Sequence, residues 1–135
     1  MNFDVTILGS SSATPIYDRH PSAQVLNIHE RFFLIDCGEG TQMQLNRYRI
    51  RYHRINHIFI SHLHGDHYLG LMGLLSTMHL QGRTVPLHLF APEDLQVPTI
   101  APKHPISRNL YKSSMLETPP EAMSFNSGKS LKTEA

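Results

Sequence analysis

Four side chains that can bind a metal ion lie within six consecutive positions of this chain: His62, His64, Asp66 and His67. Imidazole nitrogens and carboxylate oxygens are ligands of zinc and similar divalent metals, and a site with an open coordination position can be catalytic. Because alternate residues of an extended loop point the same way, His62 and His64 can converge on one ion. Asp66 and His67, one step further on, are placed to reach a second ion beside it.

The elements around this motif favour a built site over a chance cluster. The apolar stretch His57–Ile60 comes directly before it and predicts a buried strand, and the helix-forming segment 69–75 comes after it. Histidine-rich stretches also occur on solvated surfaces, and ten histidines in one chain make accidental pairs more common. A single His-x-His pair would favour that explanation. The full pattern between a strand and a helix is far more specific, so we expect metal binding.

The composition is that of a single small domain. A chain of 135 residues can bury about two thirds of its unfolded surface, and its 40% apolar residues concentrate between Phe3 and Leu89. The net charge of +1 is too small to indicate a nucleic-acid partner by itself. One cysteine, Cys37, cannot form an internal disulfide, which fits a reducing compartment. Neither a signal peptide nor an apolar run of about 18 residues is visible, so we expect a cytoplasmic protein with no membrane partner.

The remaining elements follow from apolar patterns and turn residues. The predicted strands are Phe3–Leu8, Gln24–His29, Phe32–Ile35 and Leu87–Phe90, with a tight turn at Glu30-Arg31. One predicted helix runs from the N-cap Thr41 to Tyr48, and a second runs from Leu69 to Leu80 with Gly82 as the stop. Strands followed by helices indicate a layered α/β domain with helices on one face of the sheet. The other face is also apolar, so something further should cover it.

The composition changes after Pro92. Five of the nine prolines lie between Pro98 and Pro120, and the segment from His104 shows no helical or strand period. Such a segment buries too little apolar surface to offset its ordering entropy. We therefore predict a domain over residues 1–92 and a divergent tail, disordered or loosely packed, over residues 93–135.

The metal motif and a second motif together resemble one known family. Asp-Cys-Gly-Glu-Gly-Thr-Gln at 36–42, taken with the extended metal motif at 61–71, resembles ribonuclease Z, the tRNA 3′-processing endonuclease of the metallo-β-lactamase superfamily. The segments 8–15 and 87–92 are also similar to that family, so the resemblance runs from Phe3 to Pro92. It implies a metallo-β-lactamase-type αβ/βα sandwich of two similar halves packed sheet on sheet, of which this chain carries about the first β/α half.

The resemblance also implies an activity and roles for the four motif residues. His62 and His64 would bind a first zinc ion, and Asp66 and His67 a second. Asp66 would in addition accept the proton of a metal-activated water that attacks the phosphodiester of precursor tRNA and removes the 3′ trailer. Enzymes of this family are typically homodimers, so the complete protein is expected to be one.

The chain departs from the family after Pro92. We find no match there to the family's remaining ligands, two histidines and a bridging aspartate, or to its tRNA-binding arm, and His104 has no recognisable counterpart. Losing such partners weakens metal sites, so we expect the chain alone to be catalytically incomplete. Two alternatives stay open: an inactive zinc-binding or associating fragment, or another hydrolase of the superfamily such as a lactonase, thioesterase or arylsulfatase. The 36–42 motif argues against the latter.

Several weaker signals have two explanations. Segment 46–54 interleaves four arginines with tyrosines: the arginines would suit RNA phosphates and bases could stack on Tyr48 or Tyr52, but a solvated helix end or a subunit contact explains the pattern equally well. His79 and His88 are expected to be packed or surface residues rather than ligands. Cys37 is expected to be a small buried thiol.

Overall fold

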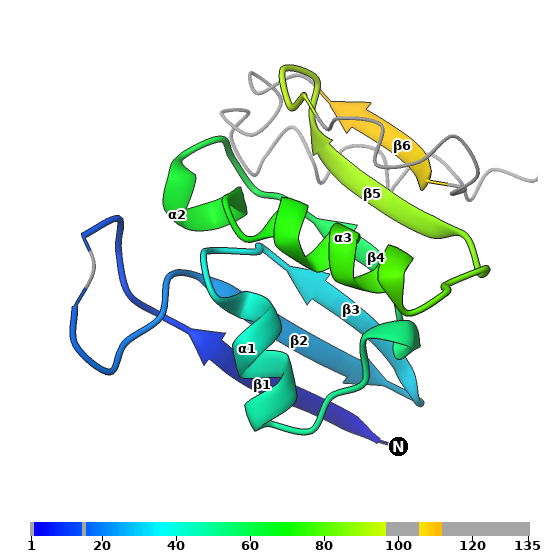
Figure 1. Cartoon of the computed structure of the whole chain (residues 1–135), viewed down its shortest axis with the longest axis horizontal. Helices are drawn as coiled ribbons and strands as arrows, with labels where there is room; N and C mark the ends of the chain where they lie inside the picture. The colour runs from blue at the N-terminus through cyan, green and yellow to red at the C-terminus, as the bar shows by residue number, and fades with distance from the viewer. Residues whose placement is uncertain (1, 15, 97–105, 112–135) are drawn as a thin grey trace, which may run out of the picture.

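The computed structural model describes residues 2–14, 16–96 and 106–111. They form a six-stranded sheet whose spatial order is the chain order (Figure 1). The strands are β1 (Phe3–Gly9), β2 (Ala23–Ile28), β3 (Arg31–Ile35), β4 (Ile55–Phe59), β5 (Leu87–Pro92) and β6 (Ile106–Tyr111). The helices are α1 (Thr41–Arg47), the short 3-10 helix η1 (Tyr52–Arg54), α2 (Gly65–Tyr68) and α3 (Leu71–Leu80). The strands β1 to β3 pair antiparallel, and β3 to β6 pair parallel.

The hairpin between β2 and β3 is confirmed, but the predicted turn residues are wrong by one position. Ile28 pairs with Arg31, so the turn consists of His29 and Glu30 rather than Glu30 and Arg31. Both turn residues have positive φ, 49° and 65°. A two-residue hairpin turn of type I′ requires two such left-handed residues, and its twist matches that of the strands. Neither is glycine or asparagine, so the sequence carries no marker for this turn.

The helices begin and end differently from the prediction at two places. Gly40, with φ of 80°, is the N-cap of α1, while the hydroxyl of Thr41 donates to the carbonyl of Gly38 at 2.6 Å. The second predicted helix, Leu69–Leu80, begins two residues later, at Leu71, and a separate short helix, α2, precedes it. A Cβ on Gly70 would lie 2.0 Å from the Gly38 oxygen, so the two backbones approach more closely than any other residue allows.

The end of α3 is confirmed at Gly82. This glycine has φ of 74°, its N–H donates to His79 at 2.9 Å, and the next N–H, of Arg83, donates to Met78 at 3.1 Å. The two bonds form a Schellman motif, which satisfies carbonyls that the last turn of a helix would otherwise leave unpaired.

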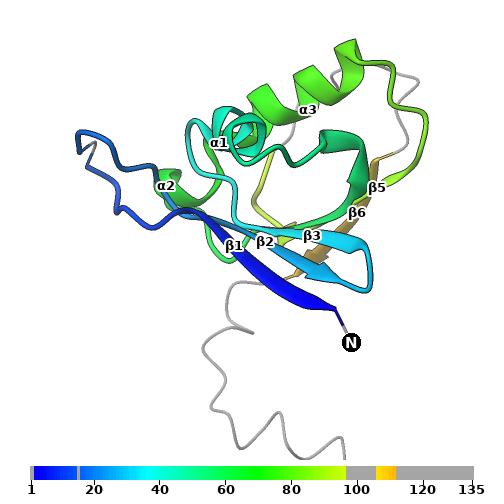
Figure 2. The ribbon, with the colours of Figure 1, turned by 90° about the horizontal axis from the view of Figure 1, so that it is seen from below.

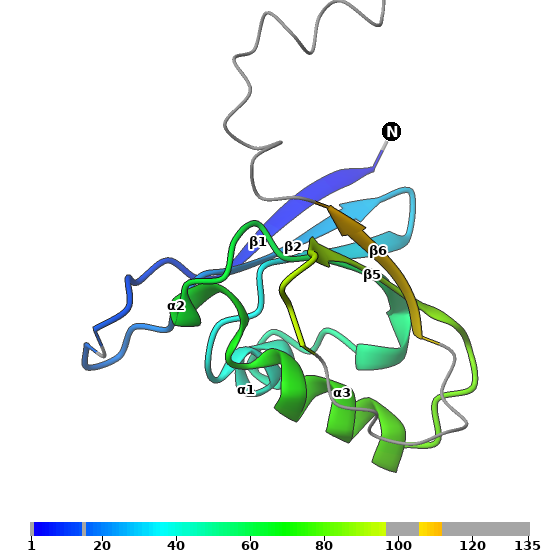
Figure 3. The ribbon, with the colours of Figure 1, turned by 90° about the horizontal axis from the view of Figure 1, so that it is seen from above.

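The core lies between the sheet and the helices. Figures 2 and 3, seen from opposite sides, show α1 and α3 on the same face of the sheet. Leu34, Ile58 and Leu89 from the central strands, and Leu45 and Leu74 from these helices, are completely buried. The expectation of an α/β sheet covered by helices on one face is therefore confirmed.

The opposite face of the sheet is also apolar, as expected from the sequence. Phe3, Val5 and Ile7 are about half exposed on β1, and Phe59 and Phe90 stack with ring centroids 4.6 Å apart on β4 and β5. None of the described helices covers this face (Figure 2). That another element covers it stays a prediction.

The strand β6 was not predicted. It lies in a segment without alternating apolar residues and pairs in parallel register with β5, Leu87 opposite Ile106. Backbone pairing with a neighbour defines this strand, and a side-chain pattern does not reveal it. The predicted division after residue 92 stays a prediction, because most of the segment 93–135 lies outside the described residues. No helix in the described ranges is long and apolar enough to cross a bilayer.

Candidate metal centre

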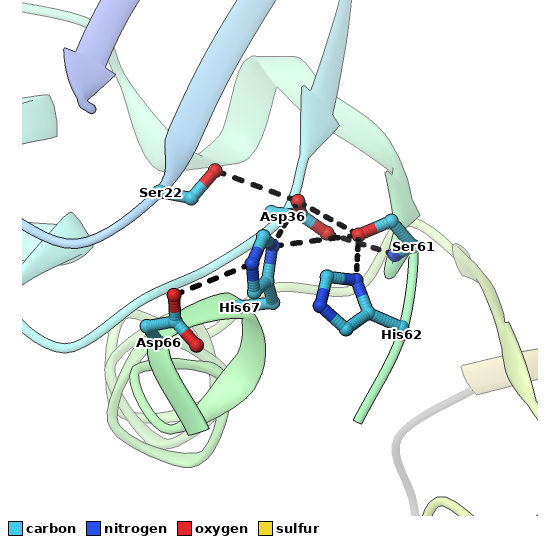
Figure 4. Close-up of polar contacts among 6 residues, drawn as sticks. All are labelled: Ser22, Asp36, Ser61, His62, Asp66 and His67. Atoms are coloured by element: carbon cyan, nitrogen blue, oxygen red, sulfur yellow. Dashed lines mark hydrogen bonds and ion pairs between the residues drawn. The ribbon is translucent and has the colours of Figure 1, made fainter. Parts of the chain in front are cut away.

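Two adjacent parallel strands place the residues of the candidate site at one edge of the sheet. Asp36 follows β3, Ser61 and His62 follow β4, and the short helix α2 carries Asp66 and His67 (Figure 4). The carboxyl ends of parallel neighbours meet at the same edge, and here the Asp36 N–H donates to the Phe59 carbonyl at 2.7 Å. Residues 25 and 31 positions apart are thereby brought into hydrogen-bond contact.

Asp36 is the centre of a hydrogen-bond network. Its side chain is only 8% exposed, and its carboxylate accepts from the Ser61 N–H at 2.8 Å, the Ser61 hydroxyl at 2.9 Å and Nδ1 of His67 at 2.6 Å. Its backbone has φ of 59°, a conformation that costs an ordinary residue free energy. No role for Asp36 was predicted from the sequence. The available signal was its position directly after a buried strand beside the strand that carries the metal motif.

This network fixes the tautomers of two histidines. A carboxylate only accepts hydrogen bonds, so Nδ1 of His67 carries the hydrogen. The Ser61 hydroxyl gives its own hydrogen to Asp36 and therefore accepts from Nδ1 of His62, 2.9 Å away. In the neutral form of both rings, Nε2 then keeps its lone pair. A metal-binding histidine has this arrangement, with one nitrogen held by a hydrogen bond and the other free to bind.

The four predicted ligands lie close together. The ring of His62 lies 3.8 Å from that of His67 and 4.7 Å from that of His64, measured between centroids. Asp66 Oδ2 lies 3.4 Å from Nε2 of His67. With the hydrogen on Nδ1, these two atoms are both acceptors, and a shared cation would stabilise such a contact.

The donor set fits a metal ion in its chemistry, but it is incomplete in number. Within residues 2–14, 16–96 and 106–111, no group of three or more His, Cys, Asp or Glu side chains is arranged to hold one ion. The site therefore offers oriented imidazoles and a carboxylate to which further ligands must be added. The assignment of His62 and His64 to one ion, and of Asp66 and His67 to another, stays a prediction.

Backbone contacts hold the two loops of the site together. The Cys37 N–H donates to the His67 carbonyl at 2.8 Å, and the Gly70 N–H donates to the Cys37 carbonyl at 2.9 Å. Cys37 itself is completely buried, as expected, and burial raises the pKa of its thiol to about 12. A completely buried thiol that stays protonated at neutral pH fits a packing role.

Two other histidines considered as ligands lie elsewhere. His88 is on β5, where its ring stacks on His57 at 5.0 Å on the open face of the sheet. His79 is near the end of α3. Both fit the expectation of packed or surface residues.

The sequence matches the protein family described as "Anti-Pycsar protein Apyc1" over residues 3–100. The chain belongs to this family. Ribonuclease Z of Bacteroides thetaiotaomicron is 54% identical over 94 residues, which are 70% of this chain and 30% of that protein. Ribonuclease Z of Porphyromonas gingivalis is 49% identical over 94 residues, 70% of this chain and 31% of its own length. The predicted resemblance to ribonuclease Z is thereby confirmed.

Solved structures agree on the fold. Human tRNase Z, short form, is 46% identical with a TM-score of 0.62, covering 67% of this chain and 35% of that one. The metallo-β-lactamase fold protein YhfI of Bacillus subtilis, 21% identical with a TM-score of 0.66, covers 80% of this chain and 45% of its own. The chain thus has a partial metallo-β-lactamase fold, as predicted, and spans about a third of the length of its ribonuclease Z relatives.

Proposed function

We propose that the chain carries the first metal-binding half of a ribonuclease Z-type phosphodiesterase, which removes 3′ trailers from precursor tRNA. The observation that supports this most is the tautomer network: hydrogen bonds to Asp36 and Ser61 leave Nε2 free in the rings of His62 and His67, and Nε2 of His67 lies beside Asp66. A packed or surface histidine cluster needs no such buried carboxylate. The identity to ribonuclease Z relatives supports the choice of substrate.

Zinc is the proposed metal, with His62 and His64 as ligands of one ion and Asp66 and His67 as ligands of a second. When bound, a pair of zinc ions supplies charge stabilisation at phosphoryl oxygens and lowers the pKa of water. These four residues would supply only part of the coordination, so the proposal requires further ligands.

Three residues of the chain have proposed roles beyond metal binding. Asp66 accepts the proton of the attacking water at a carboxylate oxygen. Asp36 is a positioning residue that acts through His67 and, by way of Ser61, through His62. The exposed side chain of His64 lies at the solvent side of the cluster, where a substrate can approach. Attack on the phosphodiester leaves a 3′-hydroxyl on the tRNA and a 5′-phosphate on the trailer.

The proposed partners are precursor tRNA and, for the complete protein, a second subunit, in the cytoplasm. The similarity to ribonuclease Z and to human tRNase Z supports the tRNA substrate.

The test compares a trailer-bearing tRNA with simple ester substrates in the presence of zinc. Once the further ligands are supplied, we expect cleavage of the tRNA and not of the esters, and loss of that cleavage in Asp66→Ala. Cleavage of the esters alone would contradict the proposal and favour another hydrolase of the superfamily. Zinc retained without any cleavage would favour the second candidate, an inactive zinc-binding fragment, which the incomplete donor set of the described residues supports.

A further inference from the structure

The turn that precedes β4 lies at the opposite end of β3 and β4 from the candidate metal centre (Figure 1). Arginine side chains gather around this turn. Arg49, Arg51 and Arg54 line a cavity of about 480 Å³ together with Phe32 and Ile50. A neighbouring cavity of about 320 Å³ shares Arg49 and Arg51. We call the three arginines the distal arginine patch. No acidic side chain of the described residues lines either cavity.

The three arginines differ in how they are held. Arg54 forms an ion pair with Glu30, and its guanidinium lies 4.3 Å from the centre of the Phe32 ring. Arg49 and Arg51 are exposed. Among the described residues, none accepts a hydrogen bond or ion pair from the side chain of either arginine. The patch therefore combines one fixed cation with two that are available to a ligand.

Arg49 occupies a backbone position that favours glycine. Its φ is 57°, its N–H donates to Asn46 at 3.0 Å, and the following N–H, of Ile50, donates to Leu45 at 2.8 Å. These two bonds make a Schellman motif at the end of α1, and Arg49 stands where that motif prefers glycine. An arginine kept at a strained position points to a use for its side chain.

The two cavities offer charge rather than surfaces for base stacking, because Tyr48, although half exposed, lines neither of them. Tyr52, one of the two stacking residues considered from the sequence, is only 6% exposed and donates its hydroxyl to the Gln42 carbonyl at 3.0 Å. The ring of Phe32 is covered by Arg54. Arginine guanidiniums bind phosphate oxygens in a bidentate way, and such contacts position a nucleic acid without reading its sequence.

We propose that the distal arginine patch binds the phosphodiester backbone of an RNA. RNA binding by the patch is independent of the proposed function. Only the statement that this RNA is the substrate rests on the proposed function. The five residues of β4 span about 16 Å at roughly 3.3 Å per residue, so an RNA held here contacts the chain well away from the metal centre. The patch would then hold the body of the substrate while its end reaches the site.

The test is RNA binding by the full chain, measured by fluorescence anisotropy of a labelled RNA hairpin over a range of salt concentrations, with EDTA present. Arg49→Gly and Arg51→Ala should each weaken binding several-fold and lower the slope of log affinity against log salt by about 0.9, the value for one lost phosphate contact in a duplex. Arg49→Gly should leave the melting temperature unchanged or raise it, which separates lost binding from lost folding.

Arg31→Ala is the matched control. Arg31 is also an exposed arginine, but it lines neither cavity. It precedes Phe32 by one position on β3, so its side chain points to the face of the sheet opposite to that of Phe32. An equal loss in Arg31→Ala, or an unchanged salt slope in both patch variants, would overturn the proposal. So would equal competition by polyglutamate, which would favour an acidic protein partner.

Binding in EDTA is independent of cleavage. If the chain cleaves no tRNA but the patch variants lose salt-dependent RNA binding, the proposed function fails and the patch stands. If the tRNA is cleaved and the patch variants bind RNA normally, the patch proposal fails alone.

Discussion

The two ends of β3 and β4 are built in opposite ways. At the carboxyl ends, a buried Asp36 fixes Ser61 and two histidines through hydrogen bonds of 2.6–2.9 Å. At the amino ends, Arg49 and Arg51 are exposed and have no side-chain partner among the described residues. A metal site needs its ligands oriented before binding, whereas a phosphate backbone is bound by charges that can adjust. The contrast suggests chemistry at one end and holding of a ligand at the other.

The packing of the metal-centre end should be the more sensitive to change. In Gly70→Ala the new Cβ would lie 2.0 Å from the backbone oxygen of Gly38, and no flexible side chain can move aside. We expect a loss of about 3 kcal/mol or more in the free energy of unfolding, measured by urea denaturation. Gly73→Ala is the control, because its Cβ would meet only the Gln42 side chain at 3.5 Å or more within α3. It should be neutral or stabilising by about 0.5–1 kcal/mol; a similar loss in both would contradict the close-approach explanation.

Asp36→Asn tests the orientation of the histidines. An amide can donate as well as accept, so Nδ1 of His67 is no longer held in one state, and the Ser61 relay to His62 is weakened. Zinc affinity, measured by competition with a chelating dye, should fall about 10- to 100-fold. Ser22→Ala, which removes only a contact of 3.5 Å to the same carboxylate, should change it little. An unchanged affinity in Asp36→Asn would show that the network has no part in metal binding.

The buried Cys37 gives this end a pH dependence. The pKa of its thiol is 9.0 in the unfolded chain, and burial raises that pKa to about 12 in the folded protein. The folded state therefore keeps a proton that the unfolded state loses above pH 9, and stability falls between pH 9 and 12 by up to about 1.4 kcal/mol per pH unit. Urea denaturation at about pH 8 and about pH 10 measures the fall. Cys37→Ala should lack this part of it, and an identical fall in that variant would assign the effect to other groups.

The smallest expected effect is at the distal end. Arg49→Gly removes the strain of an ordinary residue at φ of 57°, and the greater freedom of glycine in the unfolded chain offsets part of the gain. We expect a net gain of a few tenths to about 1 kcal/mol in the free energy of unfolding. Arg49→Ala keeps the strain and should show no gain. A gain in Arg49→Ala equal to that in Arg49→Gly would mean that relief of charge repulsion, and not backbone strain, is responsible.

The features that could be predicted from the sequence depend on local pattern. The strands β1 to β5, the hairpin, the end of the second helix at Gly82 and the ligand-bearing loop after β4 follow from apolar periods and from one dense motif. The four motif residues are close together because they lie within six positions. Their closeness could therefore be predicted without knowing which strands are neighbours.

What could not be predicted depends on contacts between distant segments. Asp36 has its role only because β3 and β4 are neighbours, which brings it to Ser61 and His67. Tyr52 looked available for stacking in the sequence, but its hydrogen bond to the carbonyl of Gln42 holds it in the core. The turn at His29-Glu30, the start of α3 directly after Gly70 and the pairing of β6 are likewise set by neighbouring backbone rather than by local residue preference.

The most direct measurement of the central claim is the tautomeric state of the imidazoles, read from side-chain ¹⁵N chemical shifts of the metal-free chain at neutral pH. Both His62 and His67 should carry hydrogen on Nδ1 and a lone pair on Nε2, and Asp36→Asn should disturb both rings. Hydrogen on Nε2 in both rings would contradict the claim, because the nitrogens that are not held by Ser61 and Asp36 would then have no lone pair for a metal.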